Sequence, residues 1–236
     1  MPDKYRVPLI IQINRRFLRL IFRVVFRLLG KVELHGMEKI PENNRYIIAF
    51  NHVSLVEVPL IAANWPTILE IIGAAAVWDR PGQSLLARLY AGIQVKRTEF
   101  DRDVFTQIQK ASESNRPLMI SPEGGRSHTP GLRRGKPGVA YIVDQAQIPV
   151  IPVAVIGNTM DFLSKGLRGE NPPIQMIVGD LFHLPPLTGR GKDRRNMRQQ
   201  NTDIIMARLA ELLPESYRGV YADYERILSG NPLLID

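Results

Sequence analysis

The fold is decided by the stretch Tyr46-Ile47-Ile48-Ala49-Phe50-Asn51-His52-Val53-Ser54-Leu55-Val56-Glu57-Val58-Pro59. Its first five residues are β-branched, aromatic or small and apolar, which predicts a buried strand that ends just before His52. The ends of buried strands are common binding sites in α/β proteins. The sequence therefore places an imidazole where such proteins usually carry out their chemistry.

Two titratable residues, His52 and Glu57, lie five positions apart in this stretch. Five residues of a regular helix turn about 500°, which leaves the two side chains roughly 140° apart around the axis. They meet only if His52 precedes the first turn, with Asn51 or Ser54 as the helix cap. Glu57 would then hold one imidazole nitrogen while the other faces a cleft, as in an oriented general base. A surface or capping histidine with a chance acidic neighbour explains the same spacing.

A second stretch, Ser121-Pro122-Glu123-Gly124-Gly125-Arg126-Ser127, follows another short apolar run and places a carboxylate, two glycines and a guanidinium in one turn. Together with His52 and Glu57, it resembles the glycerolipid acyltransferase family, the PlsC-like 1-acylglycerol-3-phosphate acyltransferases. The family's first block is Asn-His-x-x-x-x-Asp, in which Glu57 here replaces the aspartate. Its third block is usually Pro-Glu-Gly-Thr-Arg-Ser, with Gly125 here in place of the threonine.

Two further blocks of this family align in the same order. The second block, which runs from a glycine to an arginine, is similar to Gly92-Ile93-Gln94-Val95-Lys96-Arg97. The fourth, an apolar segment with a proline, is similar to Val150-Ile151-Pro152-Val153-Ala154-Val155. The resemblance spans residues 32–221, and four blocks in family order are far more specific than any one of them.

The resemblance implies transfer of a fatty acyl group from an acyl thioester to the hydroxyl of lysophosphatidic acid, which yields phosphatidic acid in phospholipid synthesis. His52 would be the general base and Glu57 its orienting partner. The expected phosphate-binding set is Lys96, Arg97, Glu123, Gly124, Gly125 and Arg126. Backbone N–H groups around the two glycines would also bind the oxyanion, because glycine permits close approach. We expect no permanently bound cofactor, with acyl-CoA or acyl-carrier protein as co-substrate.

Strand and helix patterns alternate along the rest of the chain. Short apolar runs predict strands at residues 67–73, 93–95, 117–120, 148–156 and 175–179, and amphipathic or capped segments predict helices at 58–63, 84–90, 104–114, 139–146 and from Asn201 or Thr202 to 213. We expect loops at 163–171 and 185–195. This βαβ-like order favours an α/β fold with a mostly buried central sheet flanked by helices, residues 31–236 forming the acyltransferase domain.

Residues 1–30 form a separate segment, predicted to be an amphipathic helix. They carry seven cationic residues against one aspartate, or +6 of the chain's formal charge of +8. Arginines recur every fourth position from Arg15 to Arg27, so they form one stripe beside a wide apolar face. An arginine at the bilayer centre costs about 2.5–3.5 kcal/mol, which favours a helix in the membrane interface over one that crosses it. A core helix of the domain is the alternative.

The expected location is the cytoplasmic face of the cell membrane, as a peripheral or monotopic protein bound to anionic lipids. The chain has no cysteine, which excludes an acyl-cysteine intermediate and zinc–thiolate sites. Its four histidines are scattered, so no metal site is expected. The positive charge follows an apolar helix rather than aromatic-rich strands, which argues against nucleic acid. Two rivals stay open, namely another acceptor such as glycerol 3-phosphate and a catalytically weak lipid-binding relative.

Overall fold

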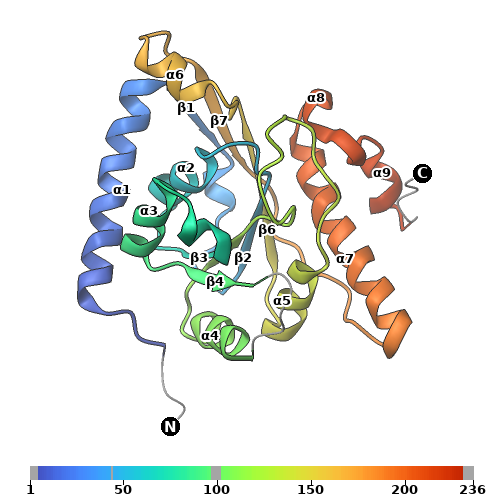
Figure 1. The fold of residues 1–236 in the computed structure, drawn as a ribbon. Coiled ribbons are helices and arrows are strands. Elements are labelled where there is room, and N and C mark those ends of the chain that lie inside the picture. Colours follow the sequence, from blue (N-terminus) through green and yellow to red (C-terminus); the bar gives the residue numbers. More distant parts are fainter. Residues whose placement is uncertain (1–4, 44, 97–101, 231–236) are drawn as a thin grey trace.

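A mixed sheet forms the centre of the chain in a computed structural model that describes residues 5–43, 45–96 and 102–230 (Figure 1). The described residues contribute seven strands in the order β1-β7-β6-β2-β5-β3-β4. All neighbouring strands run parallel except β6 and β7, which are antiparallel. The strands are β1 (Lys31–His35), β2 (Ile47–Phe50), β3 (Glu70–Ala74), β4 (Ile93–Val95), β5 (Leu118–Ile120), β6 (Val150–Ile156) and β7 (Pro173–Val178).

Helices cover both faces of this sheet (Figure 1). The α-helices are α1 (Leu9–Leu29), α2 (Glu57–Asn64), α3 (Gln83–Tyr90), α4 (Arg102–Glu113), α5 (Gly138–Ala146), α6 (Phe162–Leu167), α7 (Gly191–Leu212), α8 (Glu215–Arg218) and α9 (Tyr224–Leu228). Short 3₁₀ turns are η1 (Met37–Lys39), η2 (Ala75–Asp79) and η3 (Gly219–Tyr221). The predicted α/β architecture is confirmed.

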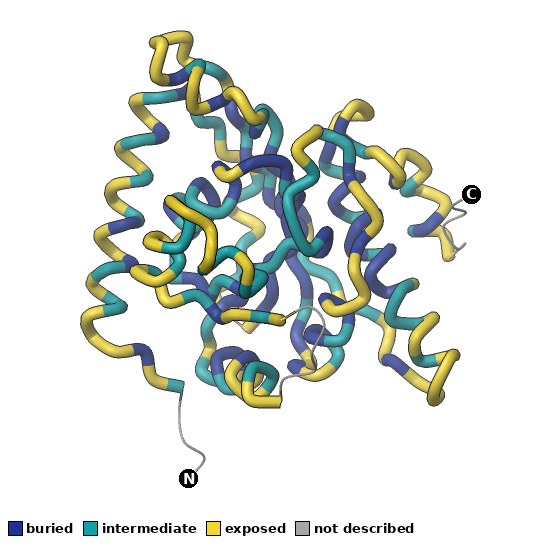
Figure 2. Tube along the Cα trace, viewed as in Figure 1, coloured by how far each residue is buried: buried dark blue, intermediate teal, exposed yellow. Residues whose placement is uncertain are grey.

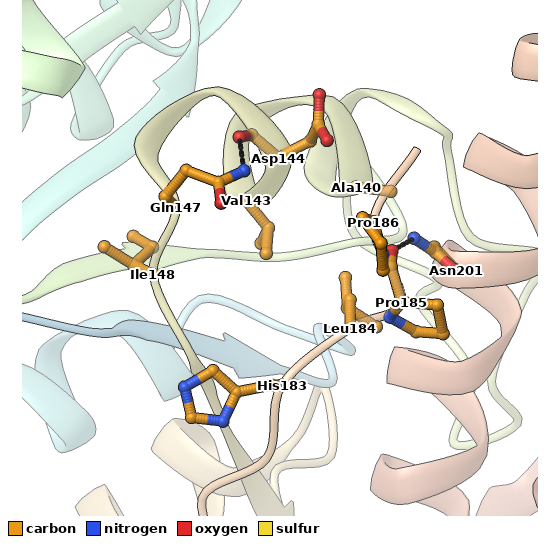
Figure 3. Close-up of a pocket in the computed structure, with 10 residues that line it drawn as sticks. All are labelled: Ala140, Val143, Asp144, Gln147, Ile148, His183, Leu184, Pro185, Pro186 and Asn201. Atoms are coloured by element: carbon orange, nitrogen blue, oxygen red, sulfur yellow. Dashed lines mark hydrogen bonds between the residues drawn. The ribbon is translucent and has the colours of Figure 1, made fainter. Parts of the chain in front are cut away.

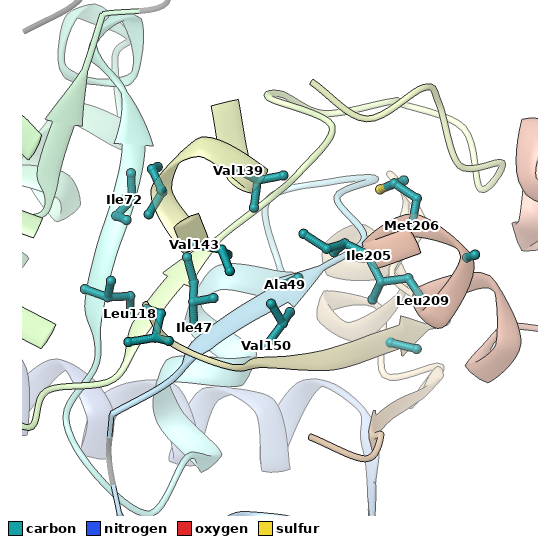
Figure 4. Packing of buried hydrophobic residues seen from close by; sticks show 14 of the residues in the cluster. Ile47, Ala49, Ile72, Leu118, Val139, Val143, Val150, Ile205, Met206 and Leu209 are labelled. Atoms are coloured by element: carbon teal, nitrogen blue, oxygen red, sulfur yellow. The ribbon is translucent and has the colours of Figure 1, made fainter. Parts of the chain in front are cut away.

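The central strand β2 separates two hydrophobic clusters. Ile47 and Ala49 pack with residues of α4, α5 and α7 on one face of the sheet (Figure 4). Ile48 and Phe50 pack with α1 and α2 on the other face. Because side chains alternate along a strand and both faces are covered, all four residues of β2 are buried. The parallel order of β2, β5 and β6 brings their carboxyl ends to one edge of the sheet.

Two segments expected to be loops are partly helical. Residues 163–171 begin within α6, where the fully buried ring of Phe162 packs 6.2 Å from that of Phe26. The expected 185–195 loop runs into α7, which begins at Gly191 and not near residue 201. Lysine, arginine and glutamine favour helix by propensity, but the polar first part of α7 lacks the apolar spacing by which a helix is predicted from sequence.

Helix α1 lies along one side of the domain and is held there by its arginines (Figure 2). Arg15 is 1% exposed and forms two hydrogen bonds, of 2.7 and 2.8 Å, to the buried carboxylate of Glu70. Arg19 and Arg23 donate to the carbonyl of Ala63 near the end of α2, where helix carbonyls lack partners. These three arginines of the predicted stripe therefore bind the domain and not lipid headgroups. The ion pair with Glu70 offsets the desolvation of the buried Arg15 guanidinium.

The outward side of α1 is apolar. Leu9 is 72% exposed and Leu28 75%, and other large apolar side chains lie between them: Ile10, Ile13, Phe17, Leu20, Ile21 and Val24. None of the described helices combines the length and the apolar content needed to cross a membrane.

Candidate active site

The end of β2 is fixed by Asn51, whose side chain is fully buried. Its amide nitrogen donates to the carbonyl oxygen of Val155 at 2.9 Å, and its amide oxygen accepts from the N–H of the same residue at 2.7 Å. These two bonds join the turn after β2 to the neighbouring strand β6. The backbone at His52 therefore starts from a rigid position.

Helix α2 begins at Glu57, and the predicted cap is wrong, since neither Asn51 nor Ser54 caps it. Asn51 is committed to Val155, and Val56 occupies the cap position without a side-chain bond. The carboxylate of Glu57 instead turns back onto the preceding bend. Its Oε1 accepts the N–H groups of Val53 at 2.8 Å and Ser54 at 2.7 Å. The glutamate thus satisfies two backbone amides of the bend that precedes the helix.

The other oxygen of Glu57 faces the imidazole. Oε2 lies 3.2 Å from Nδ1 of His52, and the Glu57 side chain is fully buried while that of His52 is 17% exposed. With Nδ1 donating to the carboxylate, the tautomer carries its lone pair on Nε2. The ring is also held at 5.6 Å from Phe50. This geometry is that of an oriented base with one nitrogen left for a substrate.

Asn158 is a third member of this arrangement that sequence reasoning missed. Its side chain is fully buried, and its Nδ2 donates to Glu57 Oε1 at 2.6 Å. Three N–H groups therefore converge on one carboxylate oxygen, which fixes the direction of the other. Its position in the sequence could have indicated this role, because Asn158 is a polar residue just after β6, and β6 is the neighbour of β2.

The loop after β5 braces the loop that carries His52. Glu123 Oε1 accepts the N–H of His52 at 2.9 Å, and Oε2 accepts the N–H of Arg133 at 3.1 Å. The N–H of Ser127 donates to the carbonyl of His52 at 2.8 Å. Burial raises the pKa of Glu123, and the two backbone N–H bonds oppose that rise. Both carboxylate oxygens are engaged with backbone, so this side chain fits a bracing role better than contact with a phosphate.

The two glycines of this loop differ in their constraints. Gly124 has φ +69°, and a Cβ there would lie 3.2 Å from Cγ of Lys136, so any other residue would be strained. Its N–H closes a turn onto the carbonyl of Ser121 at 3.1 Å. Gly125 accepts a hydrogen bond from the Arg133 guanidinium at its carbonyl. The Gly124 amide is thus used inside the turn, which is not the arrangement expected of an oxyanion donor.

The expected cations are only partly gathered here. Arg126 is half-buried in the loop after β5, beside the His52 loop. Lys96 is exposed after β4, which is separated from β2 by β5 and β3 but ends at the same edge of the sheet. Arg97 lies outside the described residues. Among the residues described, histidines and acidic side chains form no group of three that could hold a metal ion.

A separate hollow of about 190 Å³ lies between the end of α5 and residues 183–186 (Figure 3). It is lined by Val143, Ile148, His183 and Asn201, among others. Ile148 precedes β6, whereas His52 follows β2, and Ile47 of β2 pairs in parallel with Val150 of β6. The hollow therefore lies near the opposite edge of the sheet from His52 and takes no part in the site described above.

Known proteins are similar to this chain in sequence and in fold. The acyltransferase family model matches residues 31–156, which include His52, Glu57 and the Glu123 loop. The chain is 29% identical to 1-acyl-sn-glycerol-3-phosphate acyltransferase alpha of Mus musculus over 184 residues, covering 75% of this chain and 62% of that protein. It is 28% identical to 1-acyl-sn-glycerol-3-phosphate acyltransferase of Cocos nucifera over 160 residues, covering 64% and 50%. The chain thus spans about half to two thirds of these relatives.

A solved structure gives a similar result. The fold matches the crystal structure of the 1-acyl-sn-glycerophosphate (LPA) acyltransferase PlsC from Thermotoga maritima with a TM-score of 0.59. The match covers 84% of this chain and 79% of that chain at 20% sequence identity, which establishes a shared fold. The family resemblance expected from the four sequence blocks is confirmed.

Proposed function

This chain belongs to the acyltransferase family, and we propose that it transfers a fatty acyl group from an acyl thioester to the hydroxyl of lysophosphatidic acid, giving phosphatidic acid. The observation that carries the proposal is the His52–Glu57 pair, with Nδ1 held 3.2 Å from a buried carboxylate. The choice of acceptor is supported by the names of the mouse and coconut relatives. Acyl-CoA or acyl-carrier protein would supply the acyl group.

In the proposed reaction, Nε2 of His52 removes the proton of the acceptor hydroxyl as that oxygen attacks the thioester carbonyl. The C–O bond forms, the C–S bond breaks, and the thiolate leaves with the proton that His52 returns. General base catalysis of this kind typically contributes 10²–10⁴-fold. Glu57 stabilises the imidazolium that forms on His52 during the transfer.

The substrate phosphate would lie near the cationic residues at the edge of the sheet that carries His52. Arg126 is the best placed of the expected phosphate ligands, because its loop is joined to His52 by the Ser127 N–H bond. A guanidinium can bind two phosphate oxygens at once. Lys96, Arg97 and Gly125 stay in the proposed set, while Glu123 and Gly124 would act by shaping the loop.

The acceptor is a lipid, and α1 offers a surface for it. Its exposed apolar side chains are continued by Leu85, Leu86 and Leu89 of α3, which packs beside α1. On its other end α1 packs beside α6, where Leu163 and Leu167 are exposed. We propose that this surface rests in the cytoplasmic face of the cell membrane, with exposed Arg16 and Arg27 near anionic headgroups.

The experiment that tests the function measures thiol release from acyl-CoA and from acyl-carrier protein upon addition of lysophosphatidic acid. Parallel reactions contain glycerol 3-phosphate or other lysophospholipids. His52→Ala should abolish release while thermal melting stays close to that of the wild type, because His52 belongs to neither hydrophobic cluster. Activity of His52→Ala within threefold of the wild type would refute the mechanism. Thiol release with another acceptor alone would identify that acceptor, and not lysophosphatidic acid, as the substrate. No release with any acceptor would favour a lipid-binding relative.

A further inference from the structure

A second pocket lies beside the site, between the start of α5 and the first half of α7. Its volume is about 310 Å³, and it is lined by Pro137, Gly138, Tyr141, Arg195 and Arg198. Small-molecule sites typically measure about 300–1,000 Å³, so this pocket is at the lower end of that range. Its lining contains two guanidinium groups and, among the described residues, no acidic side chain.

Of the two guanidinium groups, that of Arg198 is held in place, and no ion pair to it is found among the described residues. Arg198 lies over the ring of Tyr141 at 4.8 Å, and Tyr141 packs edge-on against Phe105 at 4.8 Å. Nε of Arg198 is buried and has no hydrogen-bond partner among the described residues. The nearby acidic residue Asp144 is already paired with Arg194 at 3.0 Å. A guanidinium that is stacked in this way and has no acidic partner among the described residues is well suited to a phosphate group.

The pocket is connected to the reaction edge through the loop that precedes α5. Lys136 donates its backbone N–H to the carbonyl of Pro122 at 2.8 Å, and its side chain lies against Gly124. Pro137 and Gly138, which line the pocket, follow directly. A molecule bound here would therefore have one end beside the loop that braces His52.

The position of the pocket also separates it from the lipid. Helices α5 and α7 cover the sheet face that contains Ile47 and Ala49, whereas α1 covers the opposite face. If α1 rests on a membrane, the pocket is open to water on the far side of the sheet. Its ligand should therefore be a soluble anion and not a lipid headgroup.

We infer that this pocket binds the phosphate groups of a soluble nucleotide thioester, the acyl-CoA type of donor, while the lipid acceptor enters from the side of α1. This assignment rests on the proposed acyl transfer for its place in a reaction, although binding itself requires no turnover. Arg195 and Arg198 would contact phosphate, and the open space at Gly138, where a Cβ would meet nothing within 4 Å, would admit it.

Calorimetric titration with free CoA, dephospho-CoA and pantetheine tests the inference without any reaction. Wild type should bind CoA more tightly than pantetheine, which lacks phosphate. Arg198→Gln should weaken CoA binding about 10-fold or more, since a charge-assisted bond is lost, while Arg226→Ala on α9 should leave it unchanged. Gly138→Leu should also weaken CoA binding, because a side chain added at this lining position, where a Cβ meets nothing within 4 Å, would take up space in the pocket. Thermal melting shows whether each variant is folded.

Two results would overturn the inference. One is equal affinity for CoA in wild type, Arg198→Gln and Gly138→Leu, all folded. The other is weakened binding of acyl-carrier protein with unchanged CoA binding, which would assign the arginines to a protein partner. Failure of the pocket assignment can be told apart from failure of the proposed function. If only the pocket assignment is wrong, the arginine variant still transfers acyl groups with an unaltered KM for acyl-CoA. Arginine-dependent CoA binding in a chain that transfers no acyl group would leave the pocket assignment intact.

Discussion

Replacing Glu57 with glutamine tests how the site sets the tautomer of His52. Three N–H groups converge on Glu57 Oε1, from Val53 at 2.8 Å, Ser54 at 2.7 Å and Asn158 at 2.6 Å. A glutamine must place its oxygen there, because an NH₂ group would meet three donors. Its NH₂ group then faces Nδ1 of His52 from the position that Oε2 held at 3.2 Å.

That NH₂ group can only donate, so Nδ1 becomes the acceptor and the ring proton moves to Nε2. A ring protonated on Nε2 cannot take a proton from the acceptor hydroxyl. The expected loss is at least the general base contribution, about 10²–10⁴-fold in kcat, and a comparable aspartate-to-asparagine change in a Ser-His-Asp triad costs about 10⁴-fold. Backbone contacts of the loop are kept, so thermal stability should change little.

The assay is thiol release at saturating acyl-CoA and lysophosphatidic acid, with thermal melting as the test of folding. Glu113→Gln, an exposed change on α4, is the matched control and should retain full turnover. Glu57→Asp is the companion variant: its shorter arm cannot reach both the loop amides and Nδ1, and small misplacements near the chemistry cost up to about 10²-fold. Turnover of Glu57→Gln within threefold of wild type would show that Glu57 does not direct His52. An aspartate form faster than wild type would indicate a site that is drifting from catalysis.

Three further outcomes are expected. Arg126→Ala should raise the KM for lysophosphatidic acid far more than that for acyl-CoA, and equal changes in steady-state assays would count against a phosphate contact. Phe17→Asp should reduce sedimentation with anionic vesicles without lowering the melting temperature. Arg15→Ala should destabilise the fold in urea titration by about 3 kcal/mol, at the low end for a broken buried pair, because the Glu70 carboxylate keeps Arg116 and Tyr5. The reverse pattern would refute the assignment of the two sides of α1. Burial raises the pKa of Glu123, so the folded chain holds that proton more tightly than the unfolded chain; stability from this group is full below its ordinary pKa and is lost as pH rises through the raised value. Glu123→Gln should flatten this decline in melting temperature, and an unchanged pH profile would contradict it.

The sequence predicts the central part of this fold well, because local patterns and tertiary demands agree there. The apolar run before Asn51 can only be buried on both faces, and β2 is buried at every position. The strand-end rule likewise places His52 and the Glu123 loop at neighbouring strand ends. Asn158 escaped because its role depends on a partner 101 residues away, and no local spacing reports such a contact.

The arginine stripe of α1 is a sequence pattern that fits two different structures. A four-residue repeat of arginines beside an apolar face fits a membrane interface, but it equally fits a ridge that docks on a protein with suitable acceptors. Glu70 and the α2 carbonyls bind these arginines and so favour docking on the protein, and neither acceptor can be located from residues 1–30 alone. Removing residues 1–30 would leave Glu70 buried without Arg15 and should weaken the fold.

The same docking contact links stability to the proposed route of the substrates. Because Arg15 is bound to Glu70 at the start of β3, the outward apolar side of α1 is fixed relative to the sheet and cannot rotate freely. The proposed lipid surface on α1 and the pocket of Arg195 and Arg198 are thus held on opposite faces of one sheet, with His52 at the edge between them. A lipid hydroxyl and a soluble thioester can then reach one base from two sides without either leaving its own phase. This arrangement explains physically why a helix with a broad apolar side should be anchored by buried ions to the catalytic domain.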